Sequence, residues 1–177
     1  MEIDQLFGLP AHPLLVHMPV VFIPLTLALA IVAVAWARGR KVMSLVVAGA
    51  ATISMLGAQI AVMSGSALEE QVRETDLVEQ HAELGEGART LAILLFLVAV
   101  VFVAREWGGA LRLPGAETMR RLLSPRSVGI ALSVALIATS ALTTVWVVRA
   151  GHMGAKATWS DLPATSAGDN HGSDGDD

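Results

Sequence analysis

The sequence predicts an all-α membrane protein, a polytopic bundle of four helices with both termini outside and a disordered acidic C-terminal tail. Of its 177 residues 54% are hydrophobic and only 16% are charged. The apolar residues form four blocks, each near the roughly 20 residues that cross a bilayer. The Gly-, Ser- and Asp-rich tail cannot bury a core. We expect one domain over residues 1–159, with helices at about 13–37, 42–67, 77–107 and 127–149, and a tail over 160–177.

The charged residues predict the orientation of this bundle. Eight of the twelve Lys and Arg residues follow the first or third helix or end the third, whereas fourteen of the sixteen acidic residues fall on the opposite side. Cytoplasmic loops carry the excess of Lys and Arg. Both termini and the acidic loop between the second and third helices are therefore expected outside the cell.

The segment Leu9–Pro24 opens the first helix and carries two histidines and four prolines. Pro13 suits the first turn of a helix, because the N–H that it lacks would be unpaired there. Pro19 and Pro24 fall inside the apolar run, where each removes a backbone hydrogen bond, so the helix is expected to bend.

Small residues recur in the second helix at Gly57, Ala61 and Gly65. Ridges of small residues four apart let membrane helices approach closely. This ridge is therefore predicted to be central to the packing of the bundle.

Four of the five histidines fall on the predicted outer side. His17, His81 and His152 are the favoured candidates for cofactor ligands, because His17 lies inside its helix and the other two have glycine neighbours that would let a flat group come close. His12 is also included among the cofactor-binding candidates, although its place before Pro13 explains it as a helix-start residue as well. His171 lies in the tail. The alternative is that these imidazoles cap helix ends and meet lipid head groups.

The residue types present limit the cofactors that this layer could bind. The chain has no cysteine, which excludes disulfides, thiolate zinc, iron–sulfur ligation and the attachment of c-type haem. A b-type haem would use the histidines, with Arg89 and Arg149 near its propionates. Copper would use histidine with Met18, Met63 and Met153. Zinc would need three histidines and a carboxylate, but no local zinc motif is present.

Three segments resemble a known family. His12–Pro19 resembles the HPxxVHFP signature of the DUF2231 group of four-helix bacterial membrane proteins, with Met18 where Phe is usual. Val78–Gly85 is similar to that group's histidine segment, and Gly151–Ala155 to its closing GHxG. The resemblance implies a bacterial plasma membrane protein. Fusion of some members to Rieske or cytochrome c domains implies electron transfer, with a quinone or a respiratory-chain protein as partner.

The leading interpretation is therefore a b-type haem-binding membrane protein that transfers electrons at the outer face. It would be an electron carrier or binding protein rather than a self-contained enzyme. Its expected partners are the lipid bilayer and, if it forms an oligomer, further copies of the same chain. The alternatives are a His/Met copper- or other metal-binding accessory protein for transport and a structural subunit without a cofactor. No nucleic-acid-binding patch and no arrangement of nucleophile and base is present.

The orientation gives a first prediction. Reporters that are active only outside the cell are expected to work when fused at Glu74 or after Lys156, and to be silent at Arg40 or Gly115, because the bases crowd the latter two loops. Reporter activity in whole cells, normalised to expression, is the measurement. Activity at Gly115 would contradict the predicted orientation and place this loop outside the cell.

Overall fold

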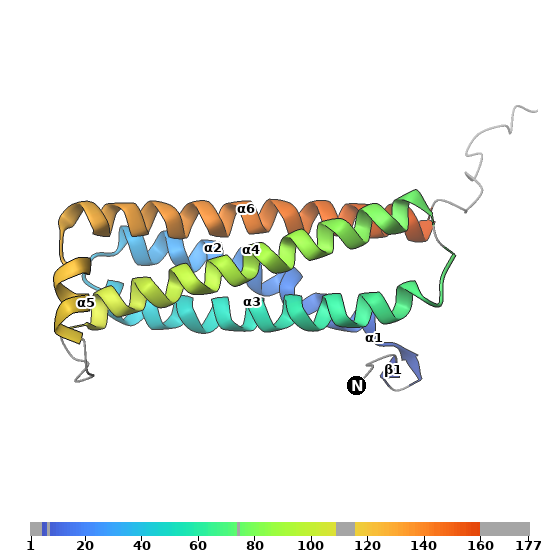
Figure 1. The fold of residues 1–177 in the computed structure, drawn as a ribbon, viewed down its shortest axis with the longest axis horizontal. Coiled ribbons are helices and arrows are strands. Elements are labelled where there is room, and N and C mark those ends of the chain that lie inside the picture. Colours follow the sequence, from blue (N-terminus) through green and yellow to red (C-terminus); the bar gives the residue numbers. More distant parts are fainter. Residues whose placement is uncertain (1–4, 7, 74, 109–115, 160–177) are drawn as a thin grey trace, which may run out of the picture.

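The computed structural model describes residues 5–6, 8–73, 75–108 and 116–159, which form an elongated helical bundle (Figure 1). Its first span is divided into α1 (Ala11–Leu15) and α2 (His17–Ala35). The other long helices are α3 (Arg40–Glu69), α4 (Asp76–Trp107) and α6 (Arg126–Trp159). A short helix, α5 (Ala116–Leu123), precedes α6. The strands β1 (Gln5–Leu6) and β2 (Leu9–Pro10) form a small antiparallel hairpin before α1.

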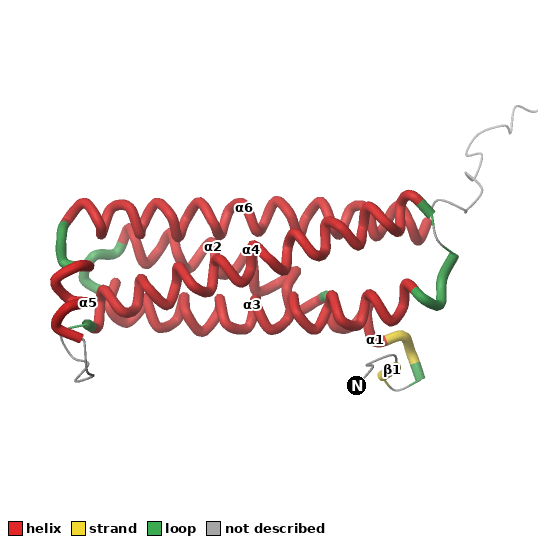
Figure 2. The backbone as a smooth tube through the Cα atoms, viewed as in Figure 1, coloured by secondary structure: helices red, strands yellow, loops and turns green. Residues whose placement is uncertain are grey.

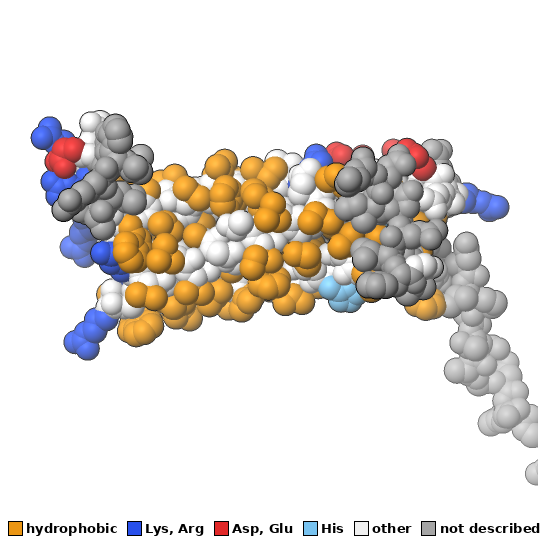
Figure 3. Space-filling view, turned by 90° about the horizontal axis from the view of Figure 1, so that it is seen from below, with side chains coloured by type: hydrophobic (Ala, Val, Ile, Leu, Met, Phe, Trp, Pro, Cys, Tyr) orange, Lys and Arg blue, Asp and Glu red, His pale blue; other side chains and the backbone are white. Residues whose placement is uncertain are grey.

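The structure confirms the predicted all-α bundle of four membrane-length helices. Each of the four spans is long and apolar enough to cross a bilayer. Hydrophobic side chains cover the middle of the face shown in Figure 3, and Lys and Arg gather at one end of it. The protein is therefore a multi-pass membrane protein. The predicted tail lies outside the described residues.

The first span is interrupted at Val16, close to the predicted bend. Pro19 has no N–H to donate to the carbonyl of Leu15, which is the last residue of α1, so one bond of the helical ladder is missing there. Val16 and Val20 still donate to carbonyl oxygens four residues earlier, at 3.0 and 3.2 Å. The interruption is thus a local break, and α2 continues through Pro24.

Two elements differ from the sequence-based expectation. The last helix was expected to end at about residue 149, but α6 continues to Trp159 and includes Gly151 and Gly154. Helix α5 was expected to be loop, although its ion pairs between Glu117 and Arg120 have the spacing that favours a helix.

The four spans pack in the cyclic order α2, α3, α4, α6, each against two neighbours. Figure 2 shows that the connections between the four spans lie at the two ends of the bundle. We call the end where α1 and α4 begin the histidine end. The end where α3 and α6 begin is called the basic end.

Side chains close the bundle at the basic end. The indole Nε1–H of Trp107, at the end of α4, donates to the carbonyl oxygen of Lys41 over 2.9 Å. The ammonium of Lys41 lies 4.4 Å from the centroid of the Trp107 ring, which adds a cation–π contact. Together these contacts join the end of α4 to the start of α3.

The buried positions match between two helical hairpins, α1/α2–α3 and α4–α6, which together form an approximate internal repeat. The buried residues of α2 are Pro19, Ile23, Thr26, Ala30 and Ala33, and those of α4 are Ala88, Ala92, Leu95, Ala99 and Phe102. Each residue of α4 follows its counterpart by 69 positions, from 19 to 88 through 33 to 102. The two helices therefore bury the same face in the same register.

The second helices of the two hairpins match in the same way. The buried residues of α6 are Leu136, Ser140, Thr143, Val147 and Ala150, and each lies 89 positions after a buried residue of α3, namely Val47, Ala51, Ser54, Ala58 and Ala61. The 20 extra residues of the second hairpin fall between its helices, where α5 lies. Both hairpins start at the histidine end, so the repeats are parallel to each other.

The ridge of small residues on α3 lies at a helix contact, as predicted, and the structure shows that its partner is the first span. A Cβ atom at Gly57 would lie 2.8 Å from Cβ of Met18 and 3.2 Å from Cδ of Pro19. Those distances leave no room for a side chain. The bare backbone of Gly57 therefore allows the close approach of α2 and α3 just after the break at Val16.

This contact gives a second prediction. Gly57→Leu is expected to destabilise the bundle by about 1–3 kcal/mol or more, as overpacking does, and to lower folded yield and the thermal unfolding midpoint in detergent. Val46→Leu is the control, because Val46 lies on the same helix with 45% of its surface exposed. Equal losses in the two variants would contradict a special role for the ridge.

Candidate site: a pair of histidines at one end of the bundle

His12, on α1, is seated on α3. Its Nδ1 lies 3.0 Å from the carbonyl oxygen of Ala61 and 3.3 Å from the hydroxyl oxygen of Ser64. A Cβ atom at Gly65 would lie 3.1 Å from Cε1 of the ring. The imidazole of His12 therefore lies against the bare backbone of Gly65. It is held by the carbonyl of Ala61, one helical turn before that glycine.

His81, on α4, is seated on α6 in the same manner. Its Nδ1 lies 2.8 Å from the carbonyl oxygen of Ala150. A Cβ atom at Gly154 would lie 2.9 Å from Cε1 of this ring. Gly154, which was predicted to let a flat cofactor come close to His152, is thus covered by the imidazole of His81.

The two imidazoles meet each other across the bundle. Their ring centroids lie 5.9 Å apart with the planes at 81°. A carbonyl oxygen can only accept, so each Nδ1 carries the proton and donates it. In the neutral rings Nε2 then holds a lone pair, and the described residues offer neither Nε2 a hydrogen bond. The pair therefore presents two fixed imidazoles whose second nitrogens are available as ligands.

The internal repeat makes these two histidines equivalent. His81 follows His12 by 69 positions, and Ala150 and Gly154 follow Ala61 and Gly65 by 89, the same offsets that relate the buried residues. Each hairpin therefore supplies one imidazole, one carbonyl and one glycine. The histidine pair, His12 with His81, is a two-fold arrangement built from both halves of the chain.

His17 and His152 are placed differently from the pair. His17 is exposed on the first turn of α2, and its position in the other repeat is occupied by Glu86. His152 is exposed on α6, where it lines a shallow cavity, and its counterpart is Met63. Neither histidine has an equivalent in the other hairpin. His171 lies outside the described residues.

The remaining predicted site residues are dispersed. Met18 packs near Gly57, Met63 is exposed, and Met153 lines the same cavity as His152. Arg89 is half-buried on α4, and the guanidinium of Arg149 lies 5.5 Å from the centroid of the Trp146 ring. Within the described residues no three His, Asp or Glu side chains are grouped so that they could hold one metal ion. The structure thus brings together two imidazoles rather than a three-residue set.

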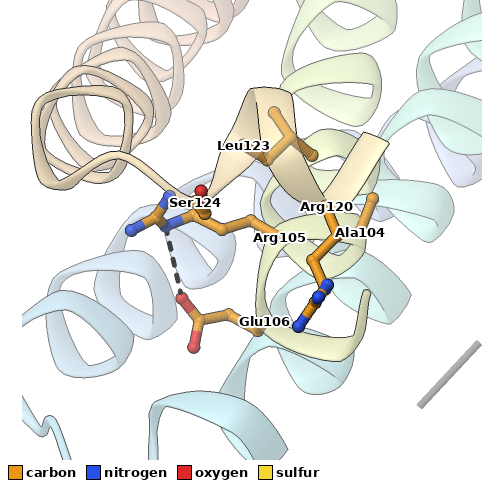
Figure 4. A pocket seen from close by; sticks show the side chains of 6 residues that line it. All are labelled: Ala104, Arg105, Glu106, Arg120, Leu123 and Ser124. Atoms are coloured by element: carbon orange, nitrogen blue, oxygen red, sulfur yellow. Dashed lines mark ion pairs between the residues drawn. The ribbon is translucent and has the colours of Figure 1, made fainter. Parts of the chain in front are cut away.

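A second hollow, of about 260 Å³, lies at the basic end and is shown in Figure 4. Arg105 donates to the carbonyl oxygen of Pro125 over 3.2 Å and lies 4.0 Å from Glu106. Arg120 is bound to Glu117 at 2.9 Å, and this hydrogen bond lowers the pKa of the Glu117 carboxyl. This hollow lies between α4 and α5. Because both arginines already have protein partners, it is a weaker candidate for a site.

His12 was included among the cofactor-binding candidates but ranked below His17, His81 and His152, because its place before Pro13 also explains it. Its pairing with His81 was not predicted. The depth of a residue in the membrane could be estimated from its spacing along a helix. The neighbouring helix toward which its side chain points could not. The signal that identifies His12 is the repeat itself. An imidazole 69 positions before His81, with an Ala-x-x-x-Gly 89 positions before Ala150–Gly154, marks the two as counterparts.

The four membrane-length helices and the histidine pair define a multi-pass α-helical membrane protein with one candidate site at the end of its bundle. The chain belongs to the DUF2231 family, whose model, described as a predicted membrane protein, matches residues 8–166. This match confirms the resemblance seen in the three motifs. No curated protein and no solved structure matches the chain.

The seat of His81 gives a third prediction. Gly154→Ala is expected to lower the thermal unfolding midpoint, because the new Cβ would meet the imidazole ring. Gly151→Ala is the matched control on the same helix, since a Cβ there meets nothing within 4 Å. It is expected to leave stability unchanged or to raise it by up to about 1 kcal/mol through helix propensity.

A double variant tests the cause of that loss. If the ring of His81 is the obstacle, Gly154→Ala is expected to cost much less in a His81→Ala background than in the parent. An equal cost in both backgrounds would show that Gly154 is needed for another reason.

Proposed function

We propose that the protein binds a b-type haem through His12 and His81 and carries electrons within the membrane. The observation that carries this proposal is the histidine pair, in which each Nδ1–H is held by a helix carbonyl. Imidazoles that ligate metals commonly donate their other N–H to a carbonyl or carboxylate, which fixes the tautomer and the ring direction. The chain thus supplies two ligands that are already oriented.

The number of ligands favours haem over zinc. A structural zinc ion takes four ligands from the protein, whereas the porphyrin of a haem supplies four nitrogens and leaves only the axial positions to the chain. The ring centroids of the pair lie 5.9 Å apart, and the two imidazoles would hold the iron through their free nitrogens. Bound there, haem would supply one-electron transfer.

Copper is a second candidate, and the direct contact between the two rings favours it. A single ion needs less room between α1 and α4 than a macrocycle does. Copper(I) accepts histidine and methionine as ligands. Met18, Met63 and Met153 are dispersed and do not complete a copper site beside the pair. The two imidazoles are therefore the ligands that a haem site and a copper site would have in common.

The fourth prediction tests the proposal. The protein purified from cells supplied with a haem precursor is expected to show a Soret band and reducible α and β bands. His12→Ala and His81→Ala are each expected to lower haem per folded protein at least several-fold, because each removes an axial ligand. His17→Ala and His152→Ala are the controls and are expected to retain full occupancy. Folding is checked by size-exclusion chromatography and thermal unfolding.

The outcomes separate the candidates. A colourless protein with stoichiometric copper that is lost in the His12 and His81 variants would replace haem by copper. Loss of the cofactor in the His17 or His152 variants alone would restore the ligand set expected from the sequence. A folded protein without haem or metal after loading with either would refute the proposal.

A further inference from the structure

A shallow cavity of about 270 Å³ lies on the side of the bundle near the histidine end, and the histidine pair does not line it. Its wall consists of Leu84 on α4 and of Val148, Arg149, His152 and Met153 on α6. We call it the lateral groove. Val148 is 63% exposed, so the groove opens toward the surroundings of the bundle rather than into the core.

The lateral groove combines an apolar floor with an arginine and a histidine. Leu84, Val148 and Met153 supply the apolar surface, and Arg149 and His152 supply the polar groups. The guanidinium of Arg149 is held over the ring of Trp146, at 5.5 Å from the centroid. Among the described residues no carboxylate lies within ion-pair distance of Arg149. Its charge is therefore positioned by the protein but not neutralised by it.

The internal repeat supplies a comparison within the same molecule. The positions that correspond to Leu84, Arg149 and His152 are Leu15, Ile60 and Met63. The apolar position is matched by the same residue, whereas both polar positions are replaced by apolar ones. The first hairpin therefore packs without an arginine or a histidine at these places. The cationic side chain and the Trp146 ring that positions it occur in the second hairpin alone, since the position matching Trp146 is Gly57.

We propose that the lateral groove binds an anionic phospholipid, with its phosphate against Arg149 and His152 and an acyl chain along Leu84, Val148 and Met153. The charge complementarity selects an anion, and the apolar floor at the end of a membrane span selects one that carries a hydrocarbon chain. Arginine donates two parallel hydrogen bonds to a phosphate. Because the guanidinium of Arg149 is already held over Trp146, its side chain loses less conformational entropy when it binds the phosphate. This proposal does not depend on the occupancy of the histidine pair.

The fifth prediction measures lipid retention. The full-length protein in detergent is mixed with phosphatidylglycerol or with phosphatidylcholine, and bound lipids are counted by native mass spectrometry. The parent is expected to retain one phosphatidylglycerol with an affinity about fivefold higher than that of Arg149→Ile, as one basic residue contributes near a membrane surface. The residue introduced is the one found at the matching position of the other hairpin. Arg149→Lys is expected to retain part of the affinity, and phosphatidylcholine is expected to show no difference between the variants.

The controls identify the source of the phosphate and the specificity of the groove. Arg73→Ile removes a cation at the same end of the bundle but outside the lateral groove, and is expected to leave retention unchanged. Equal losses for Arg73→Ile and Arg149→Ile would indicate general attraction to anionic lipid and would overturn the site. Displacement of the lipid by millimolar inorganic phosphate would show that the groove selects a soluble anion instead.

Discussion

Close approach of helix backbones is the constraint on which this structure depends. Lipid chains are as apolar as leucine, so membrane helices gain little from burying hydrophobic surface against each other and associate through tight packing and hydrogen bonds. Here the tight places are glycines that receive a side chain from the neighbouring helix. Gly57 receives Met18 and Pro19, Gly65 receives His12, and Gly154 receives His81. Two of these seats hold imidazoles, so the packing of the bundle and the geometry of the candidate site have the same origin.

The break at Val16 shows how a local feature of sequence serves this packing. Pro19 removes one helical hydrogen bond, and the short α1 that results carries His12 toward Ala61 and Gly65 of α3. The second hairpin reaches the same arrangement without a proline, through the unbroken start of α4. The two halves therefore share the contact of an imidazole with a carbonyl and a glycine of the next helix. They differ in the backbone that places the histidine, which is broken in the first half and continuous in the second.

Much of the fold was predictable because it rests on patterns within single helices. Four apolar blocks gave four spans, and the spacing of Gly57, Ala61 and Gly65 gave a ridge that does lie at a helix contact. The end of α6 was predicted ten residues too early. Gly151 and Gly154 resemble a helix end in sequence, whereas Gly154 is retained inside the helix as the seat of His81. The pairing of His12 with His81 was missed for a related reason: which faces of two helices meet depends on their packing, and only the repeat carries that information in the sequence.

The parallel repeat also has a consequence for the biogenesis of the protein. The chain is synthesised from its N-terminus, so the hairpin of α1, α2 and α3 reaches the membrane first, with His12 already able to sit on Gly65. Its counterpart exists only after α4 and α6 have been inserted, because His81 needs Ala150 and Gly154 at the far end of the last helix. The two imidazoles thus meet at the last stage of assembly. Formation of the histidine pair marks a fully inserted chain, and a chain halted in the connection that contains α5 would carry only half of it.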